Sequence, residues 1–240
     1  MKRTLVWVIY LLAAFFTLWV IARLTNMLQF YHSPTSSMSP GIELNDHFIA
    51  SNLIKPKRYD IIVFKRATDM FDGVEEPGQI SKFTYRLIAQ GGETLQIKNG
   101  FAYINGKLVD DTARLKFQYI FAAKDNLKVL EALYPGKNEP PENDWAAGND
   151  STIASFTYQQ YATAKKITEA RRFFYRSADA DTTLYLNTAA NNWDINNYGP
   201  ITIPPNHYFL MGDNRNGARD SRFIGLVPKE NVVGVVINKK

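Results

Sequence analysis

The sequence predicts a mainly β domain of antiparallel strands, interrupted by an inserted α/β subdomain and carried on one N-terminal transmembrane helix. Three observations lead to this prediction. Residues 4–22 carry no charge, short apolar runs end at Gly or Asn-Gly turns, and residues 112–180 lack that strand pattern. With 45% hydrophobic and 13% aromatic residues, the 240-residue chain is expected to fold around a substantial core.

The N-terminal apolar segment has the length of a membrane span. At about 1.5 Å per residue, residues 4–22 reach about 28 Å, close to the thickness of the hydrocarbon layer. Trp7 and Trp19 lie near its two ends, where aromatic side chains favour the membrane interfaces. We therefore expect a transmembrane helix over residues 4–23.

The charges around this segment predict its orientation. Lys2 and Arg3 place residues 1–3 in the cytoplasm and the rest of the chain outside, although Arg23 opposes this weakly. A cleaved signal peptide, with a processing site at residues 20–22, is the competing interpretation. The apolar run is long for a cleaved segment, so an uncleaved anchor is favoured.

Beyond the anchor, the pattern predicts a β core in two parts, residues 24–111 and 191–240. Residues 24–32 continue the helix, lie on the membrane surface or form a packed connector, and residues 68–79 are expected to form a loop. Asn-Gly pairs at 99–100 and 105–106 predict two hairpins. Strands are expected at residues 46–51, 58–65, 82–90, 208–211 and 232–237.

The inserted subdomain is expected over residues 112–190. Apolar residues at helical spacing predict a helix at 126–133, and the polar stretch 155–172 could also be helical. No motif within it points to chemistry. A plain surface insertion is therefore favoured over a partner-binding or substrate-binding role.

Composition excludes several classes of function. The net charge is +5, but no basic run or basic helix stands out, so no nucleic-acid partner is expected. Without cysteine, the chain forms no disulfide and no thiolate metal site. The three histidines, His32, His47 and His207, are too scattered to suggest a metal site. We expect neither a metal nor another cofactor.

Residues 33–40 carry the strongest sign of chemistry. Pro34 and Pro40 bracket a run of hydroxyl residues and make Ser33 and Ser39 extended. A stiff segment of this kind can hold a Ser nucleophile beside an oxyanion-binding N–H and hydroxyl. A Ser/Thr/Pro linker between the anchor and the domain is the alternative.

Four boxes, in order, resemble those of the bacterial type I signal peptidases. The first is Pro34–Pro40, which resembles P-S-x-S-M-x-P. The others are Arg58-Tyr59-Asp60-Ile61-Ile62-Val63-Phe64, which resembles R-G-D-I-V-V-F; Tyr85-Arg86-Leu87-Ile88-Ala89-Gln90-Gly91-Gly92-Glu93, which resembles K-R-V-I-G-L-P-G-D; and Gly212-Asp213-Asn214-Arg215 through Asp220-Ser221-Arg222, which resembles G-D-N-R…D-S-R. They cover about residues 33–108 and 193–240 and leave the middle of the chain unassigned.

The resemblance implies a serine endopeptidase of the bacterial inner membrane that cleaves signal peptides of secreted preproteins. It implies Ser37 as the nucleophile and Thr35 as the oxyanion hydroxyl, which would share a face of an extended segment. The substrate would add as a strand beside Tyr85 and residues 33–37. A charge network behind the site is implied for Arg86, Asp213, Asp220, Ser221 and Arg222.

Two positions depart from the family, and both concern the general base. Tyr85 stands where the family has its base Lys, and Ala218 where it often has the Ser that orients that Lys. A Tyr base is an anion, and poising it near neutral pH would require about 4 kcal/mol of stabilisation. Arg86 and Lys82 are expected to point away from Tyr85 on a regular strand, and His32 is a remote candidate.

Two classes of function therefore remain open. The first is a signal peptidase with impaired or absent activity, or with an unusual base. The second is a silent family member that binds extended peptides or serves as an accessory subunit of a secretion complex. The intact Ser37 favours the first class, and Tyr85 with Ala218 favours the second.

Overall fold

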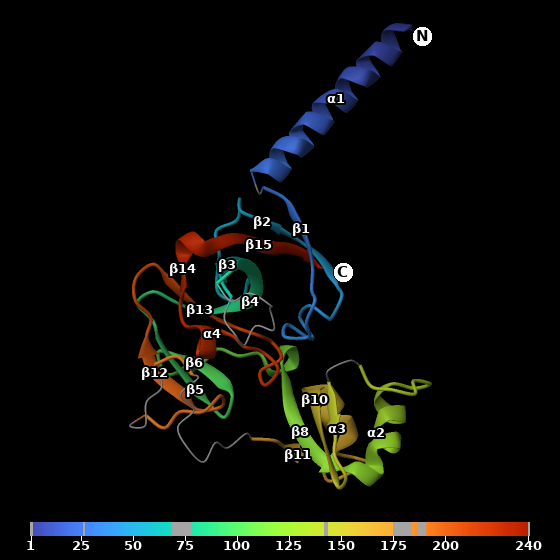
Figure 1. Cartoon of the computed structure of the whole chain (residues 1–240), viewed down its shortest axis with the longest axis vertical. Coiled ribbons are helices and arrows are strands. Elements are labelled where there is room, and N and C mark those ends of the chain that lie inside the picture. The colour runs from blue at the N-terminus through green and yellow to red at the C-terminus, as the bar shows by residue number, and fades with distance from the viewer. Residues whose placement is uncertain are drawn as a thin grey trace.

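The computed structural model describes residues 2–25, 27–68, 78–141, 144–174, 184–186 and 191–239. Helix α1 (Lys2–Leu24) projects from a β-rich body as a single rod (Figure 1). Its residues 3–24 have a mean hydropathy of 2.4, none of that surface is buried, and they are long and apolar enough to cross a membrane. The expected helix is present.

The main sheet has seven strands in the order β1-β2-β15-β3-β4-β13-β14, and its neighbours pair antiparallel. The strands are β1 (Gln29–His32), β2 (His47–Ser51), β3 (Ile61–Ala67), β4 (Ile80–Gln90), β13 (His207–Met211), β14 (Val227–Pro228) and β15 (Val232–Lys239). The five strands expected from the pattern are all present, and the mainly β antiparallel fold class is confirmed.

Strand β1 decides between two of the alternatives for residues 24–32. Residues 29–32 do not continue the helix, because they pair antiparallel with β2, as expected of a packed connector. Tyr31 stacks on Phe48 of β2, with ring centroids 5.6 Å apart. Asn52 also donates a hydrogen bond of 2.8 Å to the carbonyl of Thr25. The sheet therefore begins five residues after the end of the anchor helix.

A second sheet, in the order β12-β5-β6-β7, packs behind the first. Its strands are β5 (Thr94–Lys98), β6 (Phe101–Ile104), β7 (Lys107–Leu108) and β12 (Tyr198–Thr202). Asn99 and Gly100 both have positive φ, 50° and 79°, as do Asn105 and Gly106. Two central residues in this conformation form type I′ turns, so the two predicted hairpins are confirmed.

The inserted segment folds into a third sheet covered by helices. The sheet has the order β11-β8-β10-β9, from β8 (Lys116–Ala122), β9 (Trp145–Ala147), β10 (Ser151–Thr157) and β11 (Arg171–Arg172). Helix α2 (Asn126–Leu133) matches its prediction, whereas the helix expected over 155–172 is only α3 (Tyr158–Ala164). Ala154 and Phe156 alternate into the core as a strand, and a capping box at Thr157 then starts α3.

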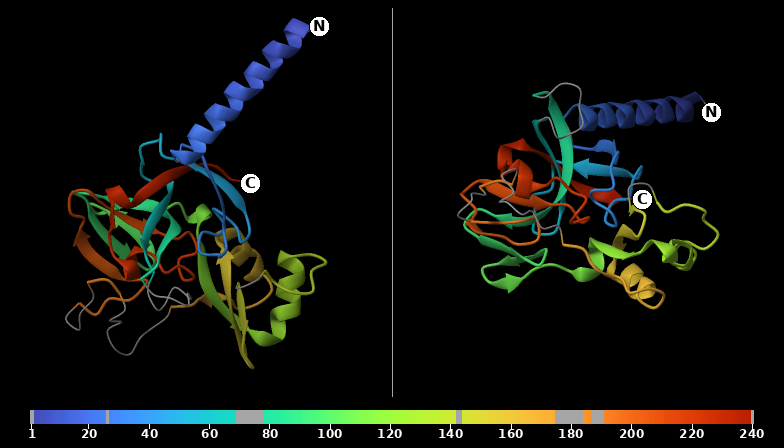
Figure 2. Two further views of the ribbon diagram at one scale, coloured as in Figure 1. Left: turned by 45° about the horizontal axis from the view of Figure 1, so that its top comes forward. Right: turned by 60° about the horizontal axis from the view of Figure 1, so that its bottom comes forward.

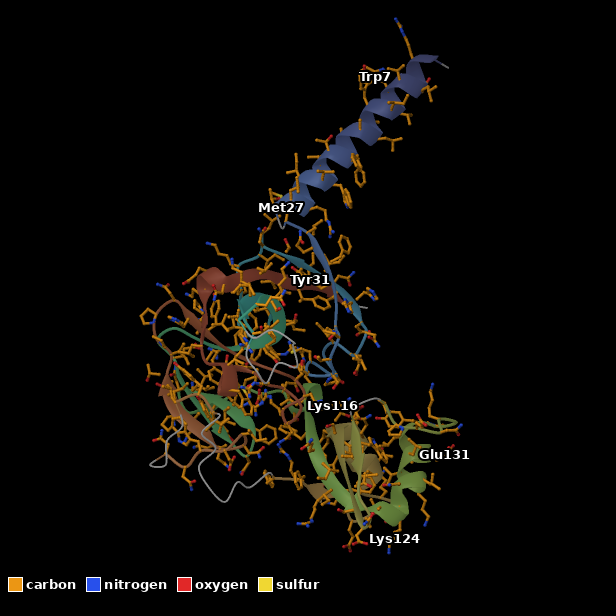
Figure 3. The ribbon with its side chains drawn as sticks, viewed as in Figure 1. Trp7, Met27, Tyr31, Lys116, Lys124 and Glu131 are labelled. Carbon is orange, nitrogen blue, oxygen red and sulfur yellow. The ribbon has the colours of Figure 1, made fainter. Side chains whose placement is uncertain are left out.

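This third sheet lies at the end of the body away from α1 in Figure 1 and in the left view of Figure 2. The first residue of β8 joins it to the loop after β13: the N–H of Lys116 donates to the carbonyl of Asp213, and Arg215 donates back to Lys116, both at 2.9 Å. Figure 3 shows Lys116 at this junction and Lys124 at the far end. The loop expected at residues 68–79 lies largely outside the described residues.

Candidate active site

The segment that follows β1 turns instead of running straight. The N–H of Ser39 donates to the carbonyl of Ser36 at 3.0 Å, and that of Ile42 to Met38 at 2.9 Å. The hydroxyl of Ser39 bonds the Glu43 carboxylate, and the Met38 side chain is buried. These local bonds hold the turn in place.

The turn leaves two hydroxyls side by side at the surface of the domain. The Oγ1 of Thr35 lies 3.0 Å from the Oγ of Ser37. Ser33 supports them from behind, because its hydroxyl donates to the carbonyl of Thr35 at 2.9 Å. The spacing expected between these two side chains is therefore present, although the backbone between them is bent.

The loop that carries residues 212–220 packs directly against the backbone of Ser37. The N–H of Asn214 donates to the carbonyl of Ser37 at 3.1 Å, and its side-chain Nδ2 to the carbonyl of Ser36 at 3.3 Å. Asn214 is buried. Sequence reasoning had given it no role, although it stands inside the Gly212–Arg215 box. It ties this box to the hydroxyl segment.

Gly212 allows this close approach. A Cβ at this position would lie 2.6 Å from the carbonyl oxygen of Ser37 and 2.3 Å from the Cβ of Ala218. We expect Gly212→Ala to lower the free energy of unfolding by about 1–3 kcal/mol and to displace Ser37. Chemical denaturation followed by tryptophan fluorescence measures this. Gly148→Ala is the control, because its Cβ would meet only Ser151 O, at 3.1 Å; equal losses in both variants would contradict the prediction.

A groove of about 370 Å³ opens beside Ser37. Thr35, Ser37 and Tyr85 all line it, so the structure brings these three predicted residues together. Its walls come from β1 and the segment after it, from the first half of β4, and from the loop after β13. Metal ligation has no support there: among the described residues, no group of three or more His, Asp or Glu side chains is placed to hold an ion.

Tyr85 extends from β4 to the opposite loop. Its side chain is buried, its ring lies 6.1 Å from that of Phe64, and its hydroxyl donates to the carbonyl of Arg219 at 3.1 Å. Ala218 is buried in the same apolar cluster. A backbone carbonyl only accepts hydrogen bonds, so this contact requires the neutral phenol. In this position Tyr85 is a donor to the loop.

The residues predicted to form a charge network lie behind the groove and do not line it. As expected, Arg86 points away from its neighbour Tyr85: it forms a buried pair with Asp213, and its Nε to Oδ1 distance is 2.7 Å. The carboxylate of Asp220 holds the guanidinium of Arg222 at 2.8 Å and the N–H of Gly212 at 3.0 Å.

Two further members complete this network. The hydroxyl of Ser221, the first residue of the short helix α4 (Ser221–Ile224), accepts from the N–H of Leu210 at 3.0 Å. Arg215, which sequence reasoning had not singled out, is fully buried and paired with Asp110. Burial raises the cost of any unpaired charge, so these pairs hold the 212–222 loop in one conformation.

The comparisons with known proteins agree with the resemblance carried by the four sequence boxes. A model of the family described as signal peptidase, peptidase S26, matches residues 2–238. The chain belongs to this signal peptidase family. It is 27% identical to signal peptidase I of Aquifex aeolicus (strain VF5) over 86% of this chain and 73% of that protein. It is 23% identical to a probable signal peptidase I-2 of Synechocystis, with 84% of this chain aligned to 57% of that protein.

Solved structures include a similar chain. A signal peptidase I from Enterococcus faecalis V583 aligns with 77% of this chain and 98% of its own, at 22% sequence identity and a TM-score of 0.33.

Three basic side chains also line the groove of this signal peptidase family member. Lys82 was expected to point away from Tyr85, and the pairing of β3 with β4 is indeed regular there. Its long side chain nevertheless lines the groove, because its ammonium reaches across to the Tyr31 ring, 5.2 Å from the centroid. His32 and Arg219 are the other two.

Proposed function

We propose that this chain is a membrane-anchored member of the signal peptidase family that binds extended signal peptides of preproteins in the Ser37 groove and cleaves them slowly or not at all. In this proposal Ser37 is the nucleophile and Thr35 the oxyanion hydroxyl. The serine of the site is retained and its base is missing. A silent accessory subunit of a secretion complex is the second candidate, and the missing base favours it as well.

The edge of β4 supports peptide binding. β13 pairs with β4 only from Arg86 to Gln90, so residues 80–85 have β3 as their one partner among the described strands. An extended peptide can add beside this part of β4 through main-chain hydrogen bonds and lie between it and residues 33–37. Its side chains would then alternate into the groove.

The hydrogen bond of Tyr85 carries the proposal for weak activity. A base for Ser37 has to accept a proton, and the Tyr85 hydroxyl instead donates its own to the Arg219 carbonyl at 3.1 Å. Ala218 offers no hydroxyl to orient another base. The serine is thus left without the group that would activate it in the family.

The anchor and the domain boundaries are part of the proposal. Residues 4–23 would span the bacterial inner membrane once, with residues 1–3 in the cytoplasm and the β domain on the periplasmic or external side. Residues 24–111 and 191–240 would form the peptide-binding β core, and residues 112–190 the inserted subdomain.

Incubation of the full chain in detergent with a preprotein bearing a small-x-small cleavage site tests the proposal. We expect photo-crosslinking of the signal peptide to the groove, and cleavage far below the ordinary range of about 1–10³ s⁻¹. Ser37→Ala is the matched control, since it should abolish residual cleavage and retain crosslinking. Cleavage at ordinary rates that disappears in Ser37→Ala would refute the proposed loss of activity, and absent crosslinking would refute peptide binding.

A further inference from the structure

A second pocket, which shares no lining residue with the Ser37 groove, opens between the segment after β2 and the start of β15. We call it the β2–β15 pocket. Its walls come from residues 52–56, from Tyr208 of β13, from Lys229 in the 3₁₀ turn before β15, and from residues 232–234. Its volume of about 240 Å³ is several times the roughly 30 Å³ that one water occupies in the liquid, so it can hold a larger polar group.

The β2–β15 pocket lies next to the end of the anchor helix. Asn52, one of its lining residues, donates the 2.8 Å hydrogen bond to the carbonyl of Thr25, the residue that follows α1. Figure 1 shows β2 and β15 at the end of the body from which α1 projects. Leu53 and Ile54 belong to the same segment and are 68% and 43% exposed. When α1 spans a membrane, this segment therefore lies at the membrane surface.

The charges of the pocket favour an anionic ligand. Lys55 and Lys229 line it, and no Asp or Glu is among the described residues that do so. Glu230 follows Lys229 in the sequence but does not line the pocket. Neither lysine forms an ion pair within the described part of the chain. Two ammonium groups without a facing carboxylate attract an anion.

Tyr208 provides a hydrogen-bond donor in the same pocket. Its side chain is only 6% exposed, and its hydroxyl has no hydrogen-bond partner among the described residues. A buried tyrosine hydroxyl is usually paired, so this one has the capacity to bind a ligand group. Burial raises the pKa of the Tyr208 phenol, which therefore keeps its proton for donation. The ammonium of Lys229 lies 5.4 Å from the centroid of the Tyr208 ring, so donor and cation are close together.

From this arrangement we infer that the β2–β15 pocket binds the phosphate headgroup of an anionic phospholipid. This inference rests on the membrane anchor of the proposed function and adds a lipid site to it. The phosphate oxygens accept a hydrogen bond from the Tyr208 hydroxyl and pair with Lys229 and Lys55. Leu53 and Ile54 contact the acyl chains of the same leaflet. No covalent bond is made or broken, and the bound headgroup holds the β domain against the membrane.

Fluorescence anisotropy of two lipids, each labelled on one acyl chain, tests the inference with the full chain in non-ionic detergent. The lipids are phosphatidylglycerol, which is anionic, and phosphatidylcholine, whose choline cation cancels the phosphate charge. We expect phosphatidylglycerol to bind about tenfold or more tightly, and the difference to shrink as salt rises. Equal binding of the two lipids, or binding of neither, would overturn the inference.

Two further measurements separate the lipid from other sources of phosphate and from failure of the anchor. Soluble glycerol 3-phosphate should not displace phosphatidylglycerol at an equal concentration, because it lacks the acyl chains. Displacement under these conditions would overturn the assignment to a lipid. Alkaline extraction of vesicles that carry the full chain tests the anchor by itself. Release of the chain would refute the membrane anchor of the proposed function, whereas a retained chain without lipid preference would refute the headgroup site alone.

Three variants locate the recognition. The double variant Lys55→Gln/Lys229→Gln should lose most of the preference for phosphatidylglycerol, and Tyr208→Phe should lose part of it by removing one donor. Both lysines are exposed, so the fold should be retained, which circular dichroism checks. Lys124→Gln/Lys166→Gln, an equal change of charge at exposed residues of the inserted subdomain, should keep the preference. If the first variant keeps the full preference, or the last loses as much, the headgroup is not bound in the β2–β15 pocket.

Discussion

A chain with both Tyr85→Lys and Ala218→Ser is expected to cleave a preprotein at least about 100-fold faster than the unmodified chain, because a positioned general base contributes about 10²–10⁴ to the rate. Residue 85 lies on the same groove as Ser37, in an apolar cluster with residue 218. Burial there favours the neutral form of a lysine, which is the form that can accept the serine proton. Gel-based cleavage of a preprotein in detergent measures the gain.

The single substitutions separate the two contributions. Tyr85→Lys alone should gain less, because Ala218 provides no hydroxyl to orient the new amine, and Ala218→Ser alone should gain nothing. Adding Ser37→Ala to the double variant is the control and should return the rate to background. If the double variant folds, binds peptide and still does not cleave, the loss of the base is not what limits this chain.

The fold was predictable wherever its cause is local. Continuous hydropathy predicts α1, and Asn-Gly pairs predict both hairpins, because the conformation that these residues favour is decided by their own backbones. The five core strands follow from apolar runs bounded by turns. The helix α2 follows from the spacing of its leucines. In each case the residues of the element and their neighbours in the sequence are enough to predict its structure.

The errors arise where distant parts of the chain meet. Residues 29–32 look like the end of a membrane helix until β2 provides hydrogen-bond partners for them. Asn214 holds the hydroxyl segment through a hydrogen bond to Ser36, which lies 178 positions earlier in the sequence. None of these partners can be read from local sequence.

The same reasoning explains why the inserted subdomain looked independent of the site. Its sequence has no motif, but its first strand begins with a buried lysine at the junction shown in Figure 3. The ammonium of Lys116 lies 2.8 Å from the Asp144 carboxylate, and both side chains are at most 6% exposed. The backbone of Lys116 meanwhile bonds Asp213, next to the residue that holds Ser37. The subdomain is therefore connected to the back of the site by a short backbone ladder at Lys116, the residue whose side chain forms the buried ion pair with Asp144.

Lys116→Met is expected to lower the free energy of unfolding by about 3–5 kcal/mol, because it leaves the buried Asp144 carboxylate without its cation. Equilibrium denaturation of the full chain in detergent measures this loss. The matched control is Arg114→Met, which breaks an exposed pair with Asp111 at 3.1 Å and should cost less than about 1 kcal/mol. Adding Asp144→Leu to Lys116→Met should recover most of the loss, since an apolar pair removes the buried charge altogether.

The pH dependence of the destabilisation by Lys116→Met follows from the direction in which the pKa of Asp144 is shifted. Burial raises the pKa of Asp144 above its usual 3.8, although Lys116 opposes the shift. A carboxyl whose pKa is higher in the folded chain favours folding when protonated, so stability falls as pH rises from the ordinary value through the raised one. Without Lys116 the pKa rises further, and the cost of Lys116→Met should be larger at about pH 7 than at about pH 5. A cost that is the same at both values, or as small as that of Arg114→Met, would mean that Asp144 carries no charge at this junction and that the backbone ladder alone attaches the subdomain.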